Sequence, residues 1–151
     1  MANVDIQLAC AARGIPSRNR IRSWVLAALG KQTEAELTVR IVDMQEGKAL
    51  NRRWRGRRQA TNVLSFPVSG LAEIAPGLLG DIVVCAPVVE KEAVEQHKEL
   101  GAHWAHMIVH GVLHLRGYDH ECRQEAEQME SMERAILKSL GYRDPYNQES
   151  T

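Results

Sequence analysis

The sequence lacks a long apolar stretch and a regular pairing of cysteines. No apolar run approaches the roughly 20 residues that a helix needs to cross a bilayer, so we expect no membrane span. The first ten residues contain no basic segment followed by an apolar one, so we expect no secretory signal. Cys10, Cys85 and Cys122 are odd in number and form no CxxC pair, which fits a reducing compartment. We therefore expect a cytoplasmic protein without a membrane partner.

The chain also lacks a net charge, but its charges are unevenly distributed. Its 19 basic residues balance 19 acidic ones, yet the stretch 48–58 contains six basic residues and no acidic one. These six residues are Lys48, Arg52, Arg53, Arg55, Arg57 and Arg58. A concentrated positive patch attracts polyanions such as nucleic acids, although an arginine-rich helix face can also be merely solvated.

The length and the apolar pattern predict one domain of the α+β class. A chain of 151 residues with 44% apolar content can bury a genuine core, so we assign 1–151 to one domain with a loose tail after about 144. The predicted strands span about 4–10, 37–41, 61–68 and 81–86. The predicted helices span about 17–29, 44–54, 87–115 (with a break at Gly101 as an alternative) and 121–140. Because these elements do not alternate regularly, we predict a small mixed sheet packed with helices.

Two residues define element ends in this prediction. Ser17 precedes an apolar helical pattern and is the expected N-cap of the first helix. Pro67 cannot donate a backbone hydrogen bond, which favours an edge strand or a strand end for 61–68.

Three histidines in the segment 110–120 have the spacing of metal ligands. His110 and His114 are four residues apart, so their imidazoles lie about 40° apart on one helix face. Two such imidazoles can bind one ion at about 2.0–2.1 Å. Gly117 lets the chain leave the helix, so that His120 can return to the same ion. A histidine pair at this spacing also arises by chance, but the glycine and the third histidine favour a metal site.

Other side chains are expected to surround this site. Three histidine ligands leave a fourth position for water, as in catalytic zinc sites, whereas Cys122 in that position would make the zinc structural. We place His103 and His106 beside the ligands, because His106, His110 and His114 extend over about 12 Å of helix, which is too far for one ion. Glu133 interrupts the apolar stripe of the last helix. Its carboxylate either bonds to the metal-binding helix or lies at the margin of the stripe with its head in water.

The string HGVLHLRGYDH at 110–120, with TNVLSFP at 61–67 and LGDI at 79–82, resembles the YbeY family of endoribonucleases. The resemblance runs from about residue 50 to 141. It implies a zincin-like α+β fold with the metal site on a central helix, one zinc ion per chain, and cleavage of single-stranded RNA. It also implies roles in maturing the 3′ end of small-subunit rRNA and in ribosome quality control, with the small ribosomal subunit and assembly factors as partners.

The resemblance also assigns residues. The zinc ligands of the family match His110, His114 and His120, and its active-site arginine matches Arg55, so we expect catalysis to depend on Arg55 and His114. The resemblance assigns no individual roles to the other basic residues of the stretch 48–58, but their positive charge suits them to hold the RNA backbone. Trp54 would stack on a base or, as in many amphipathic helices, simply pack.

Metal-assisted hydrolysis of a phosphodiester is the expected chemistry, since zinc held by imidazoles lowers the pKa of its water from 15.7 toward about 7. The general base stays open among the zinc-bound hydroxide, His106, Asp119 and the RNA 2′-hydroxyl. Nickel or cobalt would also suit three nitrogen ligands.

Two other functions are kept as alternatives. The spacing HxxxHxxGxxH also occurs in metzincin peptidases, but these need a glutamate directly after the first histidine, where this chain has Gly111. A metal-dependent hydrolase of another class is therefore disfavoured. The second alternative is a ribosome-associated RNA-binding protein with a structural zinc.

Overall fold

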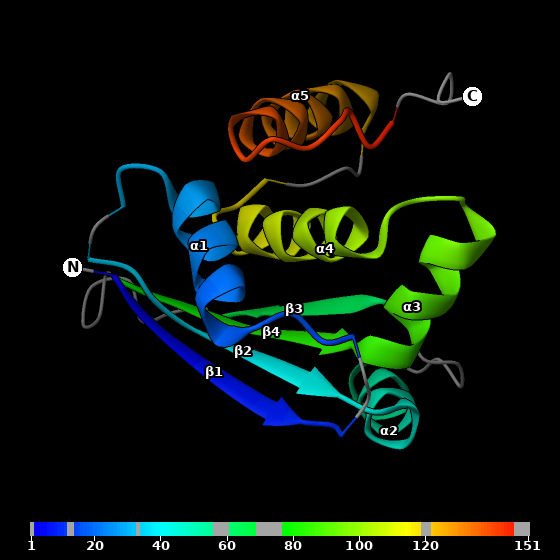
Figure 1. Ribbon diagram of the computed structural model, residues 1–151. Coiled ribbons are helices and arrows are strands. Elements are labelled where there is room, and N and C mark those ends of the chain that lie inside the picture. The colour runs from blue at the N-terminus through cyan, green and yellow to red at the C-terminus, as the bar shows by residue number, and fades with distance from the viewer. Residues whose placement is uncertain are drawn as a thin grey trace.

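A mixed four-stranded sheet carries helices on both of its faces (Figure 1). The computed structural model describes residues 2–11, 14–32, 34–55, 61–68, 77–118 and 122–146. Its strands are β1 (Asn3–Ala9), β2 (Glu36–Val42), β3 (Val63–Pro67) and β4 (Leu78–Cys85), in the order β1-β2-β4-β3. β1, β2 and β4 are parallel, and β3 pairs antiparallel with β4. The predicted α+β class with a mixed sheet is confirmed, and β3 is an edge strand, as Pro67 indicated.

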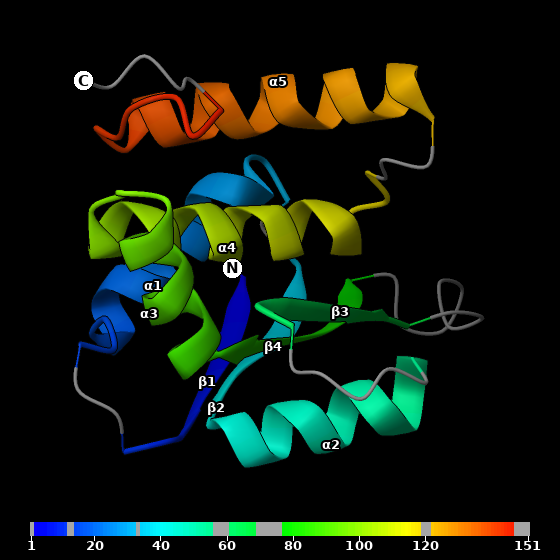
Figure 2. The same ribbon diagram turned by 90° about the vertical axis from the view of Figure 1, so that its right-hand side faces the viewer.

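Five helices within the described residues complete the fold, and they form layers around the sheet (Figure 2). They are α1 (Arg18–Leu29), α2 (Met44–Arg55), α3 (Ala86–Glu95), α4 (Leu100–Leu115) and α5 (Arg123–Ser139). In Figure 2, α4 lies between the sheet and α5, whereas α2 lies on the opposite face of the sheet. α4 is therefore the central helix of the fold. None of the described helices combines the length and the apolar character needed to span a bilayer.

The first helix begins and ends where the sequence predicts. The Ser17 side chain accepts a hydrogen bond from the backbone N–H of Arg20 at 3.2 Å, which confirms it as the N-cap. Gly30, with φ of 62°, ends the helix. The strand predicted at 81–86 begins earlier, at Leu78, because pairing with β2 and β3 extends it through Gly80.

The long helix predicted over 87–115 is two helices, so the alternative of a break is confirmed, but the break lies at residues 96–99 rather than at Gly101. α3 ends at Glu95, and His97, which is exposed, adopts a positive φ of 54° in the connection. The carboxylate of Glu99 then caps α4 by accepting from the backbone N–H groups of Gly101 and Ala102 at 2.9 and 2.8 Å. Gly101 therefore lies inside the first turn of α4.

The helix α4 is buried on nearly every side and packs closely on the sheet. Trp104, Ile108 and Leu113 are at most 1% exposed. A Cβ atom built on Gly111 would lie 2.9 Å from Cγ2 of Ile82 on β4 and 3.2 Å from Cγ2 of Val63 on β3. The absence of a side chain at Gly111 therefore lets α4 approach the edge of the sheet, where its last two turns carry the histidine pair.

Candidate metal centre

The two histidines at the end of α4 face one another with their outer ring nitrogens. Nε2 of His110 lies 3.1 Å from Nε2 of His114, and the two ring planes are 82° apart. Two ligands of a tetrahedral ion at about 2.0–2.1 Å are themselves roughly 3.3 Å apart. The spacing of these nitrogens therefore suits two ligands of one metal ion.

The end of α4 turns sharply after this pair. Gly117 has φ of 100°, its N–H bonds to the carbonyl of His114 at 3.0 Å, and the N–H of Tyr118 bonds to the carbonyl of Leu113 at 3.0 Å. This pair of bonds is a Schellman motif, which needs the left-handed conformation that glycine adopts readily. The predicted exit from the helix at Gly117 is confirmed. His120 itself lies outside the described residues.

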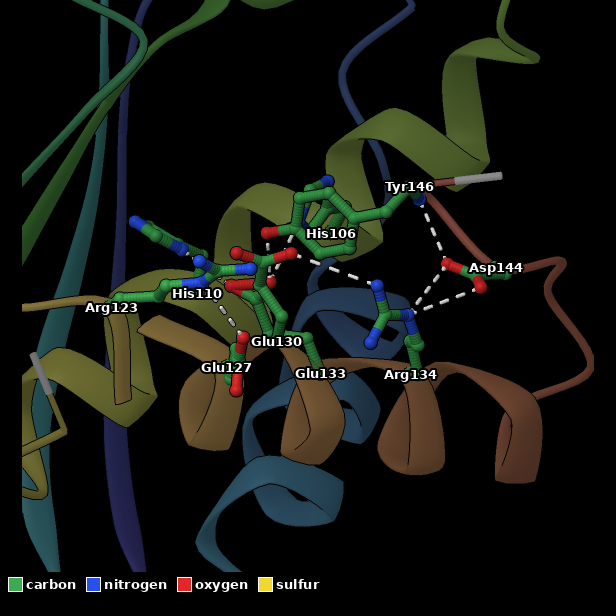
Figure 3. Close-up of polar contacts among 9 residues, drawn as sticks. All are labelled: His106, His110, Arg123, Glu127, Glu130, Glu133, Arg134, Asp144 and Tyr146. Atoms are coloured by element: carbon green, nitrogen blue, oxygen red, sulfur yellow. Dashed lines mark hydrogen bonds and ion pairs between the residues drawn. The ribbon is translucent and has the colours of Figure 1, made fainter. Parts of the chain in front are cut away.

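The other ring nitrogen of His110 is bonded to a buried carboxylate from α5 (Figure 3). Glu133 is 0% exposed, so the alternative with its head in water is wrong. Its Oε1 accepts from Nδ1 of His110 at 2.5 Å, and its Oε2 accepts from Nε2 of His106 at 3.1 Å. The hydroxyl of Tyr146 also donates to Oε2. One carboxylate thus receives hydrogen bonds from three side chains.

The charge state of this cluster follows from burial and hydrogen bonding. Burial alone would raise the pKa of Glu133, but hydrogen bonds from His106 and His110 outweigh it and lower the pKa to about 2. Burial, followed by the neighbouring Glu133, raises the pKa of Tyr146 well above its ordinary value, so its hydroxyl stays a donor. Burial lowers the pKa of His106. Because ionised Glu133 only accepts, Nδ1 of His110 carries a hydrogen, and in the neutral imidazole the lone pair belongs to Nε2.

His106, His110 and Glu133 form a second arrangement that could hold a metal. One ligand atom from each residue lies within 4.8 Å of the other two. Two of these contacts, at 2.5 and 3.1 Å, are direct hydrogen bonds to the carboxylate. The 2.5 Å contact is shorter than the roughly 3.3 Å between two zinc ligands, so an ion there would have to part His110 from Glu133. The pair His110 and His114 needs no such change.

The comparisons with known proteins agree with the sequence motifs. The family model described as Endoribonuclease YbeY matches residues 14–141. The chain belongs to the YbeY family. Over 149 residues it is 55% identical to the Endoribonuclease YbeY of Cellvibrio japonicus (strain Ueda107), covering 97% of this chain and 84% of that protein. The predicted resemblance is confirmed.

A solved structure supports the fold of this YbeY family member. The solution structure of the Thermotoga maritima protein TM1509 is similar, with a TM-score of 0.61 and 24% sequence identity. The similarity covers 97% of this chain and 99% of that chain. At this identity the likeness concerns the fold alone.

The structure describes some of the basic residues of the stretch 48–58 but not others. Lys48, Arg52 and Arg53 are exposed on α2. α2 continues through Arg55, whose side chain lies outside the description, as does that of Trp54. Arg57, Arg58 and Asp119 lie outside the described residues. Because α2 and α4 lie on opposite faces of the sheet (Figure 2), the exposed basic side chains of α2 and the histidine pair lie on different sides of it.

His103, which the sequence places beside the ligands, belongs to a second, partly buried polar cluster on α4, whose other members the sequence does not predict. The carboxylate of Glu92 on α3 accepts from Nε2 of His103 at 2.9 Å and from Nδ2 of Asn62, before β3, at 3.1 and 3.2 Å. Burial raises the pKa of Glu92, but the hydrogen bonds from His103 and Asn62 outweigh burial and lower it. This cluster joins α3, α4 and the start of β3, and so holds the edge strand against the metal-binding helix.

Tyr146 is the functional candidate that the sequence prediction missed. The tail after about residue 144 is expected to be loose, yet Tyr146 contacts both Glu133 and His106. A lone tyrosine near the end of a chain carries no spacing signal. The position of Glu133 in an apolar stripe indicates that its carboxylate has a buried partner, but the sequence does not show which residue that partner is.

Proposed function

We propose that this protein is a zinc-dependent endoribonuclease in which His110, His114 and His120 hold one zinc ion. The observation that carries the proposal is the 3.1 Å separation of the two Nε2 atoms, with Nδ1 of His110 already bonded to Glu133. Membership of the YbeY family supports the same reaction. Neutral imidazoles with one open ligand position suit zinc, which would supply a Lewis acid and a water of lowered pKa.

The side chains around the proposed ligands keep them in one orientation. Glu133 holds the hydrogen of His110 on Nδ1 and leaves the lone pair of Nε2 directed toward His114. His106 donates to the same carboxylate, and burial lowers its pKa, which favours the neutral imidazole. His106 thus acts beside the ligands, as the sequence also suggests. His106 and Asp119 both remain candidates for the general base that takes a proton from the attacking water.

RNA would bind across the edge of the sheet at β3. β3 packs against α4 through Gly111, where the Ser65 hydroxyl donates to the backbone carbonyl of Gly111 at 3.2 Å. α2 lies on the other face of the sheet from α4. An RNA strand that crosses this edge can therefore contact both the histidine pair and the basic residues of the stretch 48–58. We propose that Arg55 contacts the scissile phosphate and that the other basic residues hold the flanking phosphates. Those other residues are Lys48, Arg52, Arg53, Arg57 and Arg58.

The substrate that this proposal favours is single-stranded ribosomal RNA. Open strands can bend around a sheet edge and present their phosphates to a metal, whereas a duplex is stiff. Following the family resemblance, we propose maturation of the small-subunit rRNA 3′ end and ribosome quality control as the cellular roles. The small ribosomal subunit and assembly factors would then be partners, in the cytoplasm, and residues 1–151 would act as one domain.

Peptidase chemistry is disfavoured by the packing of Gly111. A glutamate general base at this position would begin with a Cβ atom 2.9 Å from Cγ2 of Ile82. Ile82 is 0% exposed and belongs to a central part of the sheet. The position that carries the base in metzincin peptidases therefore faces the core of this protein.

The test is cleavage of an end-labelled rRNA precursor by the wild-type protein and by His114→Ala, Arg55→Ala and His97→Ala, all purified identically. His97→Ala is the matched histidine control, because His97 is exposed in the connection between α3 and α4. We expect wild-type and His97→Ala to cut at the same sites, and the other two variants to bind RNA without cutting. Equal cleavage by all four proteins would mean a contaminating nuclease and would overturn the proposal.

Zinc content and its ligands are measured on the same samples. X-ray absorption with only nitrogen and oxygen neighbours supports an open catalytic site. A sulfur neighbour would assign Cys122 to the metal and favour an RNA-binding protein with a structural zinc.

A further inference from the structure

The segment after α5 folds back onto that helix and is held there by one arginine (Figure 3). Nε of Arg134 donates to the two carboxylate oxygens of Asp144 at 3.2 and 3.1 Å. Oδ1 of Asp144 also accepts from the backbone N–H of Tyr146 at 2.8 Å. The guanidinium carbon of Arg134 lies 5.3 Å from the centre of the Tyr146 ring. These contacts form a hook, defined here as residues 144–146, which points the tyrosine toward α4.

The hook delivers a hydroxyl to the carboxylate behind His110. Tyr146 donates to Oε2 of Glu133, while Oε1 accepts from Nδ1 of His110. Nε2 of His106 lies 3.1 Å from Oε2 and 3.2 Å from the tyrosine oxygen, so it shares its hydrogen between them. The tyrosine and His106 rings meet edge to face at 5.3 Å. Oε1 thus has one donor and Oε2 has two, so hydrogen bonds at both oxygens fix the orientation of Glu133.

We propose that Tyr146 is a positioning residue for the metal ligand His110. By occupying Oε2, its hydroxyl keeps Oε1 on Nδ1 of His110, and so keeps the Nε2 lone pair directed at the metal position. The proposal rests on the proposed function of His110 as a ligand. Asp144 and Tyr146 lie beyond residues 14–141, so the stretch matched by the family model does not include the hook.

The space beside the carboxylate explains why one hydroxyl can matter. A pocket of about 240 Å³ is lined by His110, Ala126, Met129, Glu130, Glu133 and Tyr146. Without the hydroxyl, water from this pocket can solvate Oε2, and Glu133 gains room to rotate away from His110. Partners of metal-bound histidines typically change metal affinity by 10–100-fold when they are lost. Tyr146 is one hydrogen bond further from the metal than Glu133, so we expect its loss to lower metal affinity by about tenfold or slightly less.

The experiment compares wild-type protein with Tyr146→Phe and Tyr142→Phe. Phenylalanine at position 146 keeps the ring that packs on His106 and Arg134 and removes only the hydroxyl. Tyr142 is the matched control, because its hydroxyl accepts from Arg20 at 3.2 Å and its ring packs edge to face on Trp24, away from Glu133. Zinc affinity is measured by competition with a chromophoric chelator. The tautomer of His110 is measured by ¹⁵N NMR of the metal-free proteins.

We expect Tyr146→Phe to bind zinc about five- to tenfold more weakly and to show His110 as a mixture of tautomers. Wild-type and Tyr142→Phe should share one zinc affinity and one tautomer, with hydrogen on Nδ1. Asp144→Asn, which weakens the hook but keeps the hydroxyl, should fall between them.

Two results would overturn the proposal, and they differ in what else they overturn. If Tyr146→Phe matches wild-type in both zinc affinity and tautomer, the positioning role is wrong while the proposed function stands. If wild-type protein does not bind zinc, the ligand assignment and the positioning role both fall.

Discussion

Replacing Gly111 by alanine tests how the packing of α4 positions the histidine pair. The new Cβ would lie 2.9 Å from Cγ2 of Ile82 and 3.2 Å from Cγ2 of Val63. Ile82 is fully buried and β-branched, so it cannot swing aside as the end of a flexible chain would. Overpacking of this kind costs about 1–3 kcal/mol, and the better helix propensity of alanine returns up to about 1 kcal/mol. These contributions leave a net destabilisation of about 0–3 kcal/mol, and because Ile82 cannot move aside we expect the middle of that range, about 1–2 kcal/mol.

The matched control is Gly101→Ala in the first turn of the same helix. There the new Cβ meets the end of the flexible Arg20 side chain at 2.8 Å, which can move, and the capping carboxylate of Glu99 at 3.1 Å, which has to shift by only a few tenths of an ångström. Its stability should stay within about 0.5 kcal/mol of wild-type. Both free energies come from urea unfolding, and in a chain of this size 1 kcal/mol corresponds to about 2–4 °C in Tm.

Gly111→Ala should lose most of its RNA cleavage rate even under conditions in which it remains folded. The displaced helix carries His110, and misplacing a reacting group by about 1 Å can cost roughly 100-fold in rate. A Gly111→Ala protein as stable as Gly101→Ala would refute the claim that α4 touches the sheet through this glycine. Destabilisation with unchanged cleavage would instead separate the packing from the metal centre.

Two further predictions concern the buried Glu133 and the partly buried Glu92. Glu133→Gln keeps the shape of the side chain but replaces one of its two acceptor oxygens by a donor. Zinc affinity, measured by chelator competition, should therefore fall by about 10–100-fold. An unchanged affinity would contradict the role of Glu133. Glu92 has a pKa below its unfolded value, so it adds stability above an unfolded pKa of about 4.3, and this contribution is lost as the pH falls through the folded pKa. Urea unfolding of Glu92→Gln should therefore show a shallower loss of stability in acid than wild-type; parallel curves would contradict this.

Local patterns predict the parts of the fold that local interactions decide. Ser17 caps its helix by a bond to a residue three positions away, and Pro67 confines its strand to an edge because it lacks an N–H. The restart of the helix at Glu99 was missed, since glutamate is not a preferred N-cap residue. Gly101 interrupts the helical pattern of the sequence, whereas the side chain of Glu99, two residues earlier, decides where α4 begins.

The candidate site divides in the same way. The spacing of His110 and His114 is a property of one helix, so the sequence predicts that they meet. The partner of Glu133 depends on how α5 packs over α4, and the contact with Tyr146 depends on the chain reversing after α5. Likewise, the charge of the stretch 48–58 is visible in the sequence, but its position on the opposite face of the sheet from α4 is not.

Docking of the hook and binding of zinc should be coupled through His110, and this coupling is reciprocal. Nδ1 of His110 bonds to the carboxylate that Tyr146 holds, while Nε2 faces His114. If the docked hook raises zinc affinity about tenfold, zinc must stabilise the docked hook by about 1.4 kcal/mol.

Zinc should therefore slow hydrogen exchange of the backbone N–H of Tyr146, which bonds to Asp144, by up to about tenfold. The backbone N–H of Arg20 on α1, bonded to the N-cap Ser17, is the internal control and should not respond. Equal responses of both amides would indicate general stabilisation by the metal, and then the hook and the metal centre would not be specifically linked.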